Sequence, residues 1–279
     1  MRVLSWNLYH GRDFPPDRSL FTLRSRLLRA TERNATHVQV NRPLLDELAR
    51  LLDELDWDLA LLQEAPPRWF EELGRRTRSS GARVLTARNL CPPVQARLAR
   101  WNPDLIASWE GGSNQLLVRA PARIVEHRGL TLARRPERRR MQWARVELAG
   151  GSRLCVANLH ASTRPPGDAG TEVVAAAGAA VEWSATDPLV FGGDFNLRPG
   201  RRPEPFAVLR ERFGLEEPTA PDAIDHVLAR GLDTTEGPRR LPPEDRELTE
   251  PDGRRLRLSD HAPVVAGFMR YSQAVHERQ

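Results

Sequence analysis

Short apolar runs alternate with stretches of one-sided apolar spacing along most of this chain. Between residues 43 and 55 the leucines recur at the spacing of an amphipathic helix, and Asn41 just ahead of them is expected to cap it. The same criteria predict helices over residues 68–78 and 171–183. Strands are predicted over ten short apolar runs, at residues 2–6, 58–63, 83–87, 114–119, 122–132, 141–148, 153–160, 188–192, 223–228 and 262–269.

The balance of these elements bears on the fold class. Strands outnumber helices, and two sheets packed face to face with helices outside would bury all of them. The pattern alone does not separate this arrangement from an ordinary three-layer α/β sheet. Residues 232–255 are rich in proline, glycine and charge and are expected to form a long surface loop. We expect one domain over residues 1–270, followed by a polar tail at residues 271–279.

Composition excludes several classes of protein. Of the 279 residues, 40% are hydrophobic and 28% are charged, as in a globular protein rather than a disordered or fibrous one. No apolar run approaches the roughly 20 residues of a membrane-spanning helix. The residues after Met1 contain no signal-peptide core, so we expect a cytoplasmic protein, and a monomer. Cys91 and Cys155 are too few for a disulfide framework and are expected to be reduced packing residues.

The charge count indicates the kind of partner. All 42 basic residues are arginines, against 37 acidic residues, which gives a net charge of +5. This mild excess is compatible with a phosphate-bearing partner such as DNA or RNA. The densest basic run, residues 134–140, is either a solvated hairpin tip or an arm that follows a phosphate backbone. Trp101, Trp109 and Trp143 could stack on bases, although packing inside the protein is the commoner role of tryptophan.

Polar side chains capable of chemistry recur at the ends of five predicted strands. They are Asn7, Glu64, His160, the pair Asp194 and Asn196, and the pair Asp260 and His261. A single polar residue at a strand end is usually part of a turn. The whole set is harder to explain in that way, because strand ends on one edge of a sandwich converge on a single cleft.

The residue types in this set indicate phosphate ester hydrolysis. Carboxylate oxygens from Glu64 and from Asp194 or Asp260, with amide oxygens from Asn7 and Asn196, suit Mg²⁺ or Mn²⁺. Histidines paired with carboxylates can donate hydrogen bonds to a phosphate or protonate a leaving group. A carboxylate can also orient and deprotonate an attacking water for in-line displacement.

These segments resemble the endonuclease/exonuclease/phosphatase superfamily, which has the fold of deoxyribonuclease I. The matching motifs follow the family's order over nearly the whole chain: Ser5-Trp6-Asn7-Leu8, Leu61-Leu62-Gln63-Glu64, Ala157-Asn158-Leu159-His160, Gly193-Asp194-Phe195-Asn196, Ile224-Asp225-His226 and Ser259-Asp260-His261. The resemblance implies a four-layer α/β/β/α sandwich, with two packed mixed sheets flanked by helices. It also implies a divalent-metal-dependent phosphoric ester hydrolase.

The resemblance assigns metal-binding and catalytic roles to these positions. Glu64 would be the principal metal ligand, with Asn7 beside it and Asp260 completing the site. Asp194 would activate the water, and Asn196 would hold the phosphate.

The remaining roles concern the histidines and the substrate. The resemblance implies that His261 contacts the scissile phosphate and that Asp225 pairs with it. His160 corresponds to the second catalytic histidine of the deoxyribonuclease-like and sphingomyelinase-like branches. Asn158, on the strand face of His160, and Arg198, just after the fourth motif, are expected to bind substrate.

Departures from the family pattern leave the substrate open. The central tyrosine group is missing, no carboxylate aligns as a partner for His160, and residues 19–40 have no recognisable counterpart. The leading hypothesis is a Mg²⁺- or Mn²⁺-dependent phosphodiesterase that acts on nucleic acid, as an endo- or exonuclease. The alternatives are a phosphatase or phosphodiesterase of a lipid or small-molecule headgroup, and an inactive phosphate-binding relative.

Overall fold

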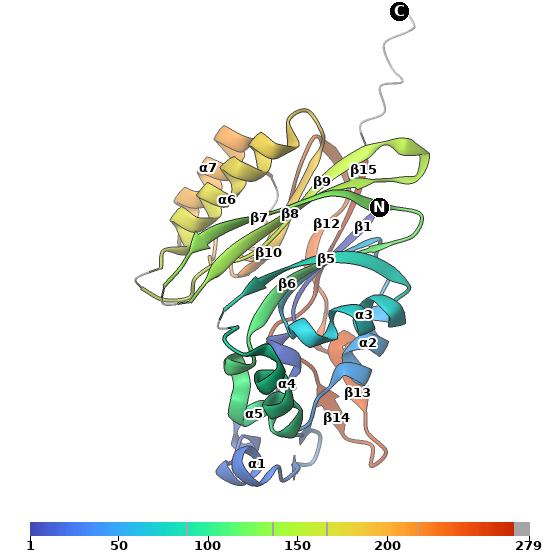
Figure 1. Cartoon of the computed structure of the whole chain (residues 1–279), viewed down its shortest axis with the longest axis vertical. Coiled ribbons are helices and arrows are strands. Elements are labelled where there is room, and N and C mark those ends of the chain that lie inside the picture. Colours follow the sequence, from blue (N-terminus) through green and yellow to red (C-terminus); the bar gives the residue numbers. More distant parts are fainter. Residues whose placement is uncertain (88, 136, 166, 217, 271–279) are drawn as a thin grey trace, which may run out of the picture.

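Two large sheets lie face to face in the computed structural model, which describes residues 1–270 except 88, 136, 166 and 217 (Figure 1). The first sheet has the order β12-β15-β1-β4-β6-β5, and the second has the order β11-β10-β9-β8-β7. The strands of the first sheet are β1 (Arg2–Asn7), β4 (Leu59–Ala65), β5 (Ser79–Thr86), β6 (Gly112–Arg119), β12 (Leu232–Arg240) and β15 (Val264–Arg270). Those of the second are β7 (Arg123–Ala133), β8 (Arg139–Glu147), β9 (Arg153–His160), β10 (Leu189–Asp194) and β11 (Asp225–Arg230).

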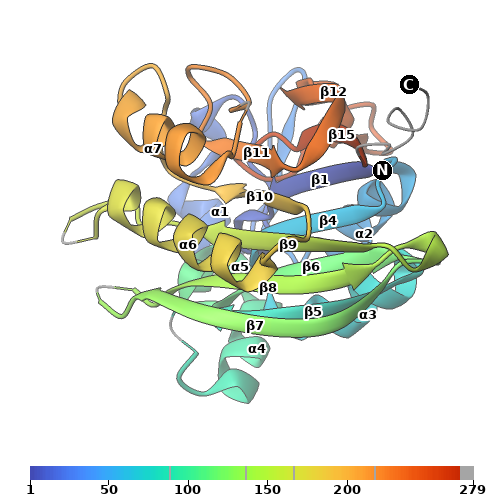
Figure 2. The ribbon, with the colours of Figure 1, turned by 90° about the horizontal axis from the view of Figure 1, so that it is seen from above.

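Helices cover the outer face of each sheet (Figures 1 and 2). The first sheet is covered by α2 (Leu45–Glu54) and α3 (Phe70–Arg76), and the second by α6 (Ala169–Ser184) and α7 (Pro203–Phe213). Three apolar cores result, one under each helical layer and one between the sheets. The expected α/β/β/α sandwich of two mixed sheets is therefore confirmed.

Additional short elements lie at one end of the sandwich. They are the helices α1 (Leu23–Leu28), α4 (Pro92–Trp101) and α5 (Pro103–Ile106), with the two-stranded pairs of β2 (Glu32–Arg33) with β3 (Val38–Gln39) and β13 (Glu247–Thr249) with β14 (Arg255–Arg257). Single-turn 3₁₀ helices include η1 (Tyr9–Gly11), η3 (Pro67–Trp69) and η4 (Ala107–Glu110). No helix among the described residues is long and apolar enough to cross a membrane.

Strand alternation explains why the polar strand ends point between the sheets. In β1, Leu4 and Trp6 belong to the core beneath α2, whereas Val3 belongs to the core between the sheets. Since side chains alternate with a period of two, Asn7 shares the inner face of Val3. The same alternation along β9 puts His160 on the inner face with Val156.

Several predictions about individual elements are wrong. Residues 232–255 are not one loop, because β12 pairs along β15 and β13 forms a hairpin with β14. Their polar sequence suits an edge strand, where β-bulges accommodate Gly237 and Pro238. Asn41 does not cap α2 but donates from Nδ2 to Asn102 Oδ1 at 2.7 Å.

The predictions about the cysteines and the tryptophans are partly confirmed. Cys155 is a buried free cysteine as expected, whereas Cys91 is exposed and is not a packing residue. Trp143 packs in the core, but Trp101 and Trp109 are exposed. The polar tail at residues 271–279 lies outside the described residues.

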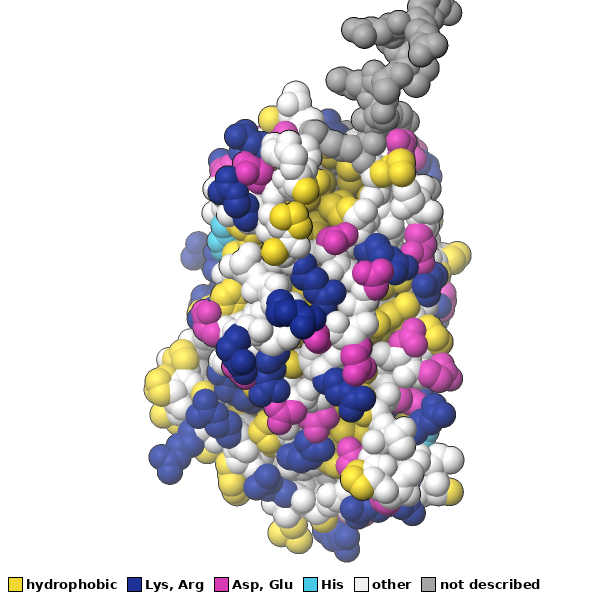
Figure 3. All heavy atoms as spheres, turned by 90° about the vertical axis from the view of Figure 1, so that its right-hand side faces the viewer, with side chains coloured by type: hydrophobic (Ala, Val, Ile, Leu, Met, Phe, Trp, Pro, Cys, Tyr) yellow, Lys and Arg dark blue, Asp and Glu magenta, His cyan; other side chains and the backbone are white. Residues whose placement is uncertain are grey.

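Surface charges are intermixed over much of the molecule. On the face shown in Figure 3, arginines and carboxylates lie beside one another over much of the surface. Many of these residues form exposed ion pairs, such as Arg50 with Glu54 and Arg75 with Glu72. Each such pair contributes little stability.

Candidate active site

The ends of β9, β10 and β11 bring three predicted site residues into one row. Asp194 is the register partner of His160 on β9 and of Asp225 on β11. The close approach of β9 and β10 depends on Gly193, which has φ of 132°. A Cβ atom there would lie 2.0 Å from the Leu159 carbonyl oxygen, so any other residue would push the strands apart.

A second row of residues faces this one from the first sheet. Asn7, at the end of β1, donates from Nδ2 to Asp194 Oδ2 at 3.0 Å, and its own Oδ1 accepts from the Tyr9 amide. Glu64 lies in β4 at a β-bulge with φ of 47°, which turns its side chain toward the cleft. Its carboxylate lies 3.3 Å from His10 Nε2 and 3.9 Å from His160 Nδ1.

His261 is held by an ion pair with Asp225. The distance from His261 Nδ1 to Asp225 Oδ2 is 2.8 Å, and His261 Nε2 lies 3.8 Å from both Asp194 and Asp260. Burial alone would lower the pKa of His261, but the Asp225 and Asp194 carboxylates raise this pKa well above its ordinary value. His261 is therefore protonated at neutral pH.

Asp194 is a buried carboxylate with two hydrogen-bond donors. Asn7 donates to Asp194 Oδ2, and the backbone N–H of Asn196 donates to Asp194 Oδ1 at 3.1 Å. Burial and the nearby Asp225 carboxylate nevertheless raise the pKa of Asp194 to about 7. Ligand atoms of Asp194, Asp225 and His261 all lie within 4.8 Å of one another.

His160 is paired with an arginine rather than a carboxylate. Arg139 Nη1 lies 3.0 Å from His160 Nδ1 and 3.1 Å from His160 Nε2. Burial, with the charge of Arg139, lowers the pKa of His160 well below its ordinary value, so its imidazole is neutral at neutral pH. The neutral ring still lies 3.5 Å from Asp194 Oδ2.

Two residues of the site were missed by the sequence analysis. Arg139 belongs to the basic run at residues 134–140, yet it is buried and does not lie on a solvated hairpin tip. His10 is buried in η1, with Nδ1 3.1 Å from the Gly111 carbonyl oxygen. Both line a cavity of about 240 Å³ together with Glu64 and His160. Neither residue stands at the end of a predicted strand, so the strand-end pattern gave no signal for them.

Of the two remaining predicted asparagines, Asn196 lies beside the cleft and Asn158 lies between the sheets. Asn196 adopts a positive φ and donates from Nδ2 to the Ala161 carbonyl oxygen at 3.0 Å, beside the cleft. Asn158 is buried, donates to the Leu62 and Gln115 carbonyl oxygens and accepts from Gln63, so it ties the two sheets together.

Arg198 is exposed, and its substrate contact stays a prediction. The structure thus brings Asn7, Glu64, His160, Asp194, Asn196, Asp225, Asp260 and His261 to one cleft, but not the side chain of Asn158.

The charge of the cleft suits a bound cation. Asp225 Oδ1 is buried and has no hydrogen-bond partner among the described residues. Burial raises the pKa of Asp260, and the Glu64 carboxylate adds to this effect. Oxygen ligands in mutual repulsion, with an orphaned buried carboxylate oxygen, are the donor set of a hard divalent ion.

Comparison with known proteins adds independent information. A sequence profile described as the Endonuclease/Exonuclease/phosphatase family matches residues 4–261. A search of curated proteins gave no match.

Solved structures show the same fold at low sequence identity. A mannosyl-6-phosphatase of Bacteroides thetaiotaomicron is similar at 13% identity and a TM-score of 0.64, over 96% of this chain and 99% of that chain. An endonuclease/exonuclease/phosphatase of Bacteroides vulgatus is similar at 15% identity and a TM-score of 0.61, over 96% and 98%. The human Nocturnin catalytic domain, solved with bound sulfate, is similar at 16% identity and a TM-score of 0.56, over 96% and 94%.

Proposed function

Because this chain belongs to the endonuclease/exonuclease/phosphatase family, whose members are phosphoric ester hydrolases, we propose that it is a divalent-metal-dependent phosphodiesterase. The observation that supports this most directly is the cluster of Asp194, Asp225 and His261. It combines a buried carboxylate whose pKa is raised to about 7 with a histidine whose pKa is raised well above its ordinary value. That combination suits the activation of water next to a phosphate.

The metal would be Mg²⁺ or Mn²⁺, held by Glu64, Asn7 and Asp260. When bound, such an ion neutralises phosphate charge and polarises the phosphoryl oxygens. The Glu64 carboxylate helps to raise the pKa of Asp260, and this mutual repulsion of two ligands supports the presence of a cation between them.

Side chains of the protein accept the proton of the water and donate hydrogen bonds to the phosphate. Asp194 orients the attacking water and takes its proton, since a base with a pKa of about 7 is matched to neutral conditions. His261 donates from Nε2 to a phosphoryl oxygen, while Asp225 fixes its ring through Nδ1. Asn196 has a second amide hydrogen beyond its bond to Ala161, and this hydrogen holds the phosphate.

His160 and Arg139 would act on the leaving group. The neutral imidazole of His160 offers a ring N–H, and the Arg139 guanidinium beside it stabilises developing negative charge. Arg139 also replaces the carboxylate partner that the family pattern led us to expect.

Nucleic acid is the substrate class that the sequence favours, with a lipid or small-molecule headgroup as the second candidate. The second candidate is supported by the exposed leucines described in the next subsection. In both cases the scissile bond is a phosphoester. Substrate screening with DNA, RNA, bis-p-nitrophenyl phosphate and phospholipid headgroups, each with added Mg²⁺ or Mn²⁺, separates the two.

The site assignment is tested by His261→Ala on the substrate that gives the highest turnover. Turnover should fall by at least about 10²-fold, because an electrostatic donor to the phosphate is lost. His127→Ala is a matched control, since His127 is exposed on β7 away from the cleft. Near-normal turnover in His261→Ala would overturn the site assignment.

A further inference from the structure

Helices α1 and α4 lie at one end of the molecule (Figure 1), and several large apolar side chains on and near them are exposed. Leu23 and Leu28 on α1 are 74% and 75% exposed, and Leu90 before α4 is 79% exposed. The other exposed large apolar side chains of this surface are Leu27, Val94, Leu98 and Trp101. Both helices contact α5, so they belong to one end of the fold. We call these seven residues the apolar rim.

The spacing of the three rim residues on α4 shows that they form a face of this helix and not a scatter of single residues. Val94, Leu98 and Trp101 follow one another at intervals of four and three along α4, which places them on one side of the helix. An ordinary surface helix turns such a stripe toward the core. On α4 this stripe is exposed instead. An exposed apolar stripe of this kind marks an interaction site.

The positive charge of the protein gathers in the same place. Residues 17–33 and 90–110, which bear the apolar rim, contain seven arginines and four carboxylates, Asp17, Glu32, Asp104 and Glu110, and so carry a net charge of +3. The whole chain carries +5, so these segments hold more than half of the excess that the composition revealed.

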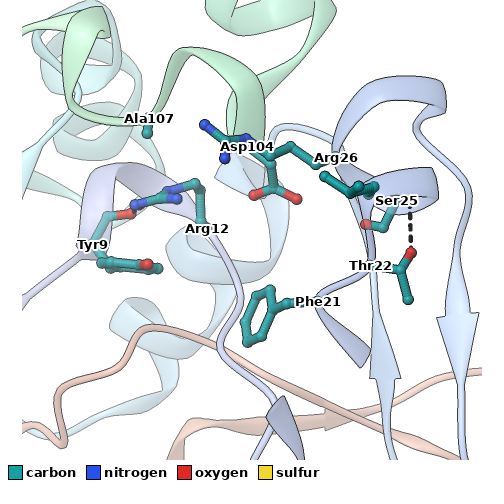
Figure 4. Close-up of a pocket in the computed structure, with 9 residues that line it drawn as sticks. Tyr9, Arg12, Phe21, Thr22, Ser25, Arg26, Asp104 and Ala107 are labelled. Carbon is teal, nitrogen blue, oxygen red and sulfur yellow. Dashed lines mark hydrogen bonds between the residues drawn. The ribbon is translucent and has the colours of Figure 1, made fainter. Parts of the chain in front are cut away.

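A pocket connects this surface with the active site. Its volume is about 430 Å³, and Phe21, Leu23 and Arg26 line one side of it. Asp104 and Ala107 line the other side, and the carboxylate of Asp104 points into the space between Arg12 and Phe21 (Figure 4). The pocket shares Tyr9, Arg12 and Ala107 with the cavity that holds Glu64 and His160.

We propose that the apolar rim and its arginines form a docking surface for an anionic lipid membrane, against which the mouth of the cleft is placed. Arginines bind lipid phosphates, and leucine and tryptophan side chains enter the boundary between headgroups and acyl chains. A nucleic acid would satisfy the arginines but would leave the exposed leucines without a partner. The docking is independent of hydrolysis. If the proposed phosphodiesterase activity is also correct, the docking favours a phospholipid headgroup as its substrate.

Co-sedimentation of the full chain with vesicles tests this proposal. We expect binding to vesicles of phosphatidylcholine mixed with phosphatidylserine, and binding at least about tenfold weaker to phosphatidylcholine alone. Leu23→Ser/Leu28→Ser should reduce binding to the mixed vesicles by a similar factor. The control is Val125→Ser/Met269→Ser, which changes two exposed apolar residues outside the rim and should bind like the wild type.

Three results would overturn the proposal. The first is that both double variants bind the mixed vesicles equally well. The second is that the wild type binds neither kind of vesicle. The third is that the wild type is a dimer in solution and that Leu23→Ser/Leu28→Ser converts it to a monomer. Thermal unfolding of each variant checks that it is folded. Hydrolysis of soluble bis-p-nitrophenyl phosphate should be the same in all variants, so a failure of the proposed hydrolase shows up separately from a failure of docking.

Discussion

Replacing Asp225 by Asn removes the carboxylate that keeps His261 protonated while retaining the size of the side chain. The wild-type contact is a 2.8 Å ion pair between His261 Nδ1 and Asp225 Oδ2, at a site where both side chains are largely buried. Asp225 is the strongest of the groups that raise the pKa of His261 against the effect of burial. An amide in its place offers at most a neutral hydrogen bond.

The size of the effect follows from the strength of a charge-assisted hydrogen bond. Such a bond contributes about 1.5–3 kcal/mol, and one pKa unit corresponds to about 1.4 kcal/mol. The pKa of His261 should therefore fall by about one to two units in Asp225→Asn. The proposed mechanism uses the protonated imidazole, so activity should be lost as the pH rises through this pKa, and in Asp225→Asn the loss should begin at lower pH.

The acidic limb of the profile should move in the same direction. Asp225 is also the charge that, after burial, most raises the pKa of Asp194. Without this charge, Asp194 becomes deprotonated, and hence competent as a base, at lower pH. The whole bell-shaped profile of kcat/KM should shift toward acid, with a lower maximum.

The assay is the pH dependence of kcat/KM for bis-p-nitrophenyl phosphate with saturating Mg²⁺. Asp222→Asn serves as the control, because Asp222 lies three residues earlier and binds the exposed Arg240 rather than a site residue. Its profile should match that of the wild type. An alkaline limb that stays in place in Asp225→Asn would refute the role given to the Asp225–His261 pair.

Three further predictions test other parts of the structure. Glu64→Gln should lower turnover at least about 10²-fold and weaken the response to added metal, whereas Glu54→Gln on the outer helix should change neither. A chelator should abolish hydrolysis and Mg²⁺ or Mn²⁺ should restore it; restoration by Zn²⁺ alone would contradict the oxygen ligand set. Arg119→Ala should lower the free energy of unfolding by about 2–4 kcal/mol in a denaturant titration, because the Arg119 guanidinium donates to four carbonyl oxygens at the end of α2 and just beyond it. An unchanged midpoint would show that water replaces those bonds at no cost.

The central layers of the fold could be predicted because their strands have a one-sided or fully apolar pattern. Buried strands such as β4 and β9 appear in the sequence as short apolar runs that end in a polar residue. The edge strand β12 could not be recognised, since an edge strand needs neither an apolar face nor an unbroken ladder. Helices α1 and α4 were missed for a related reason. Their apolar side chains face solvent, and little of the core depends on them.

Some residues of the candidate site could likewise be predicted from the sequence, and others could not. Asn7, His160 and Asp194 follow from strand ends, because parallel and antiparallel pairing brings those ends to one edge. Arg139 does not follow, since unbroken alternation along β8 would place it on the face of Met141 and Trp143, away from His160. The pairing of β7 with β8 is irregular between Thr131 and Ala133, opposite that residue, and such irregularities depend on tertiary packing.

The neighbours of the two histidines account for their different roles. Both are buried in the same cleft, so burial lowers the pKa of each, and only their partners distinguish them. Asp225 keeps His261 charged, whereas Arg139 keeps His160 neutral at the same pH. Asp194 Oδ2 therefore lies 3.8 Å from the Nε2 atom of an imidazolium, His261, and 3.5 Å from that of a neutral imidazole, His160. A pair of titratable groups with opposed pKa shifts is the usual sign of divided acid and base work. Here the division depends on a carboxylate at one histidine and an arginine at the other, so the proposed mechanism gives the arginine at His160 a catalytic part instead of treating it as a missing carboxylate.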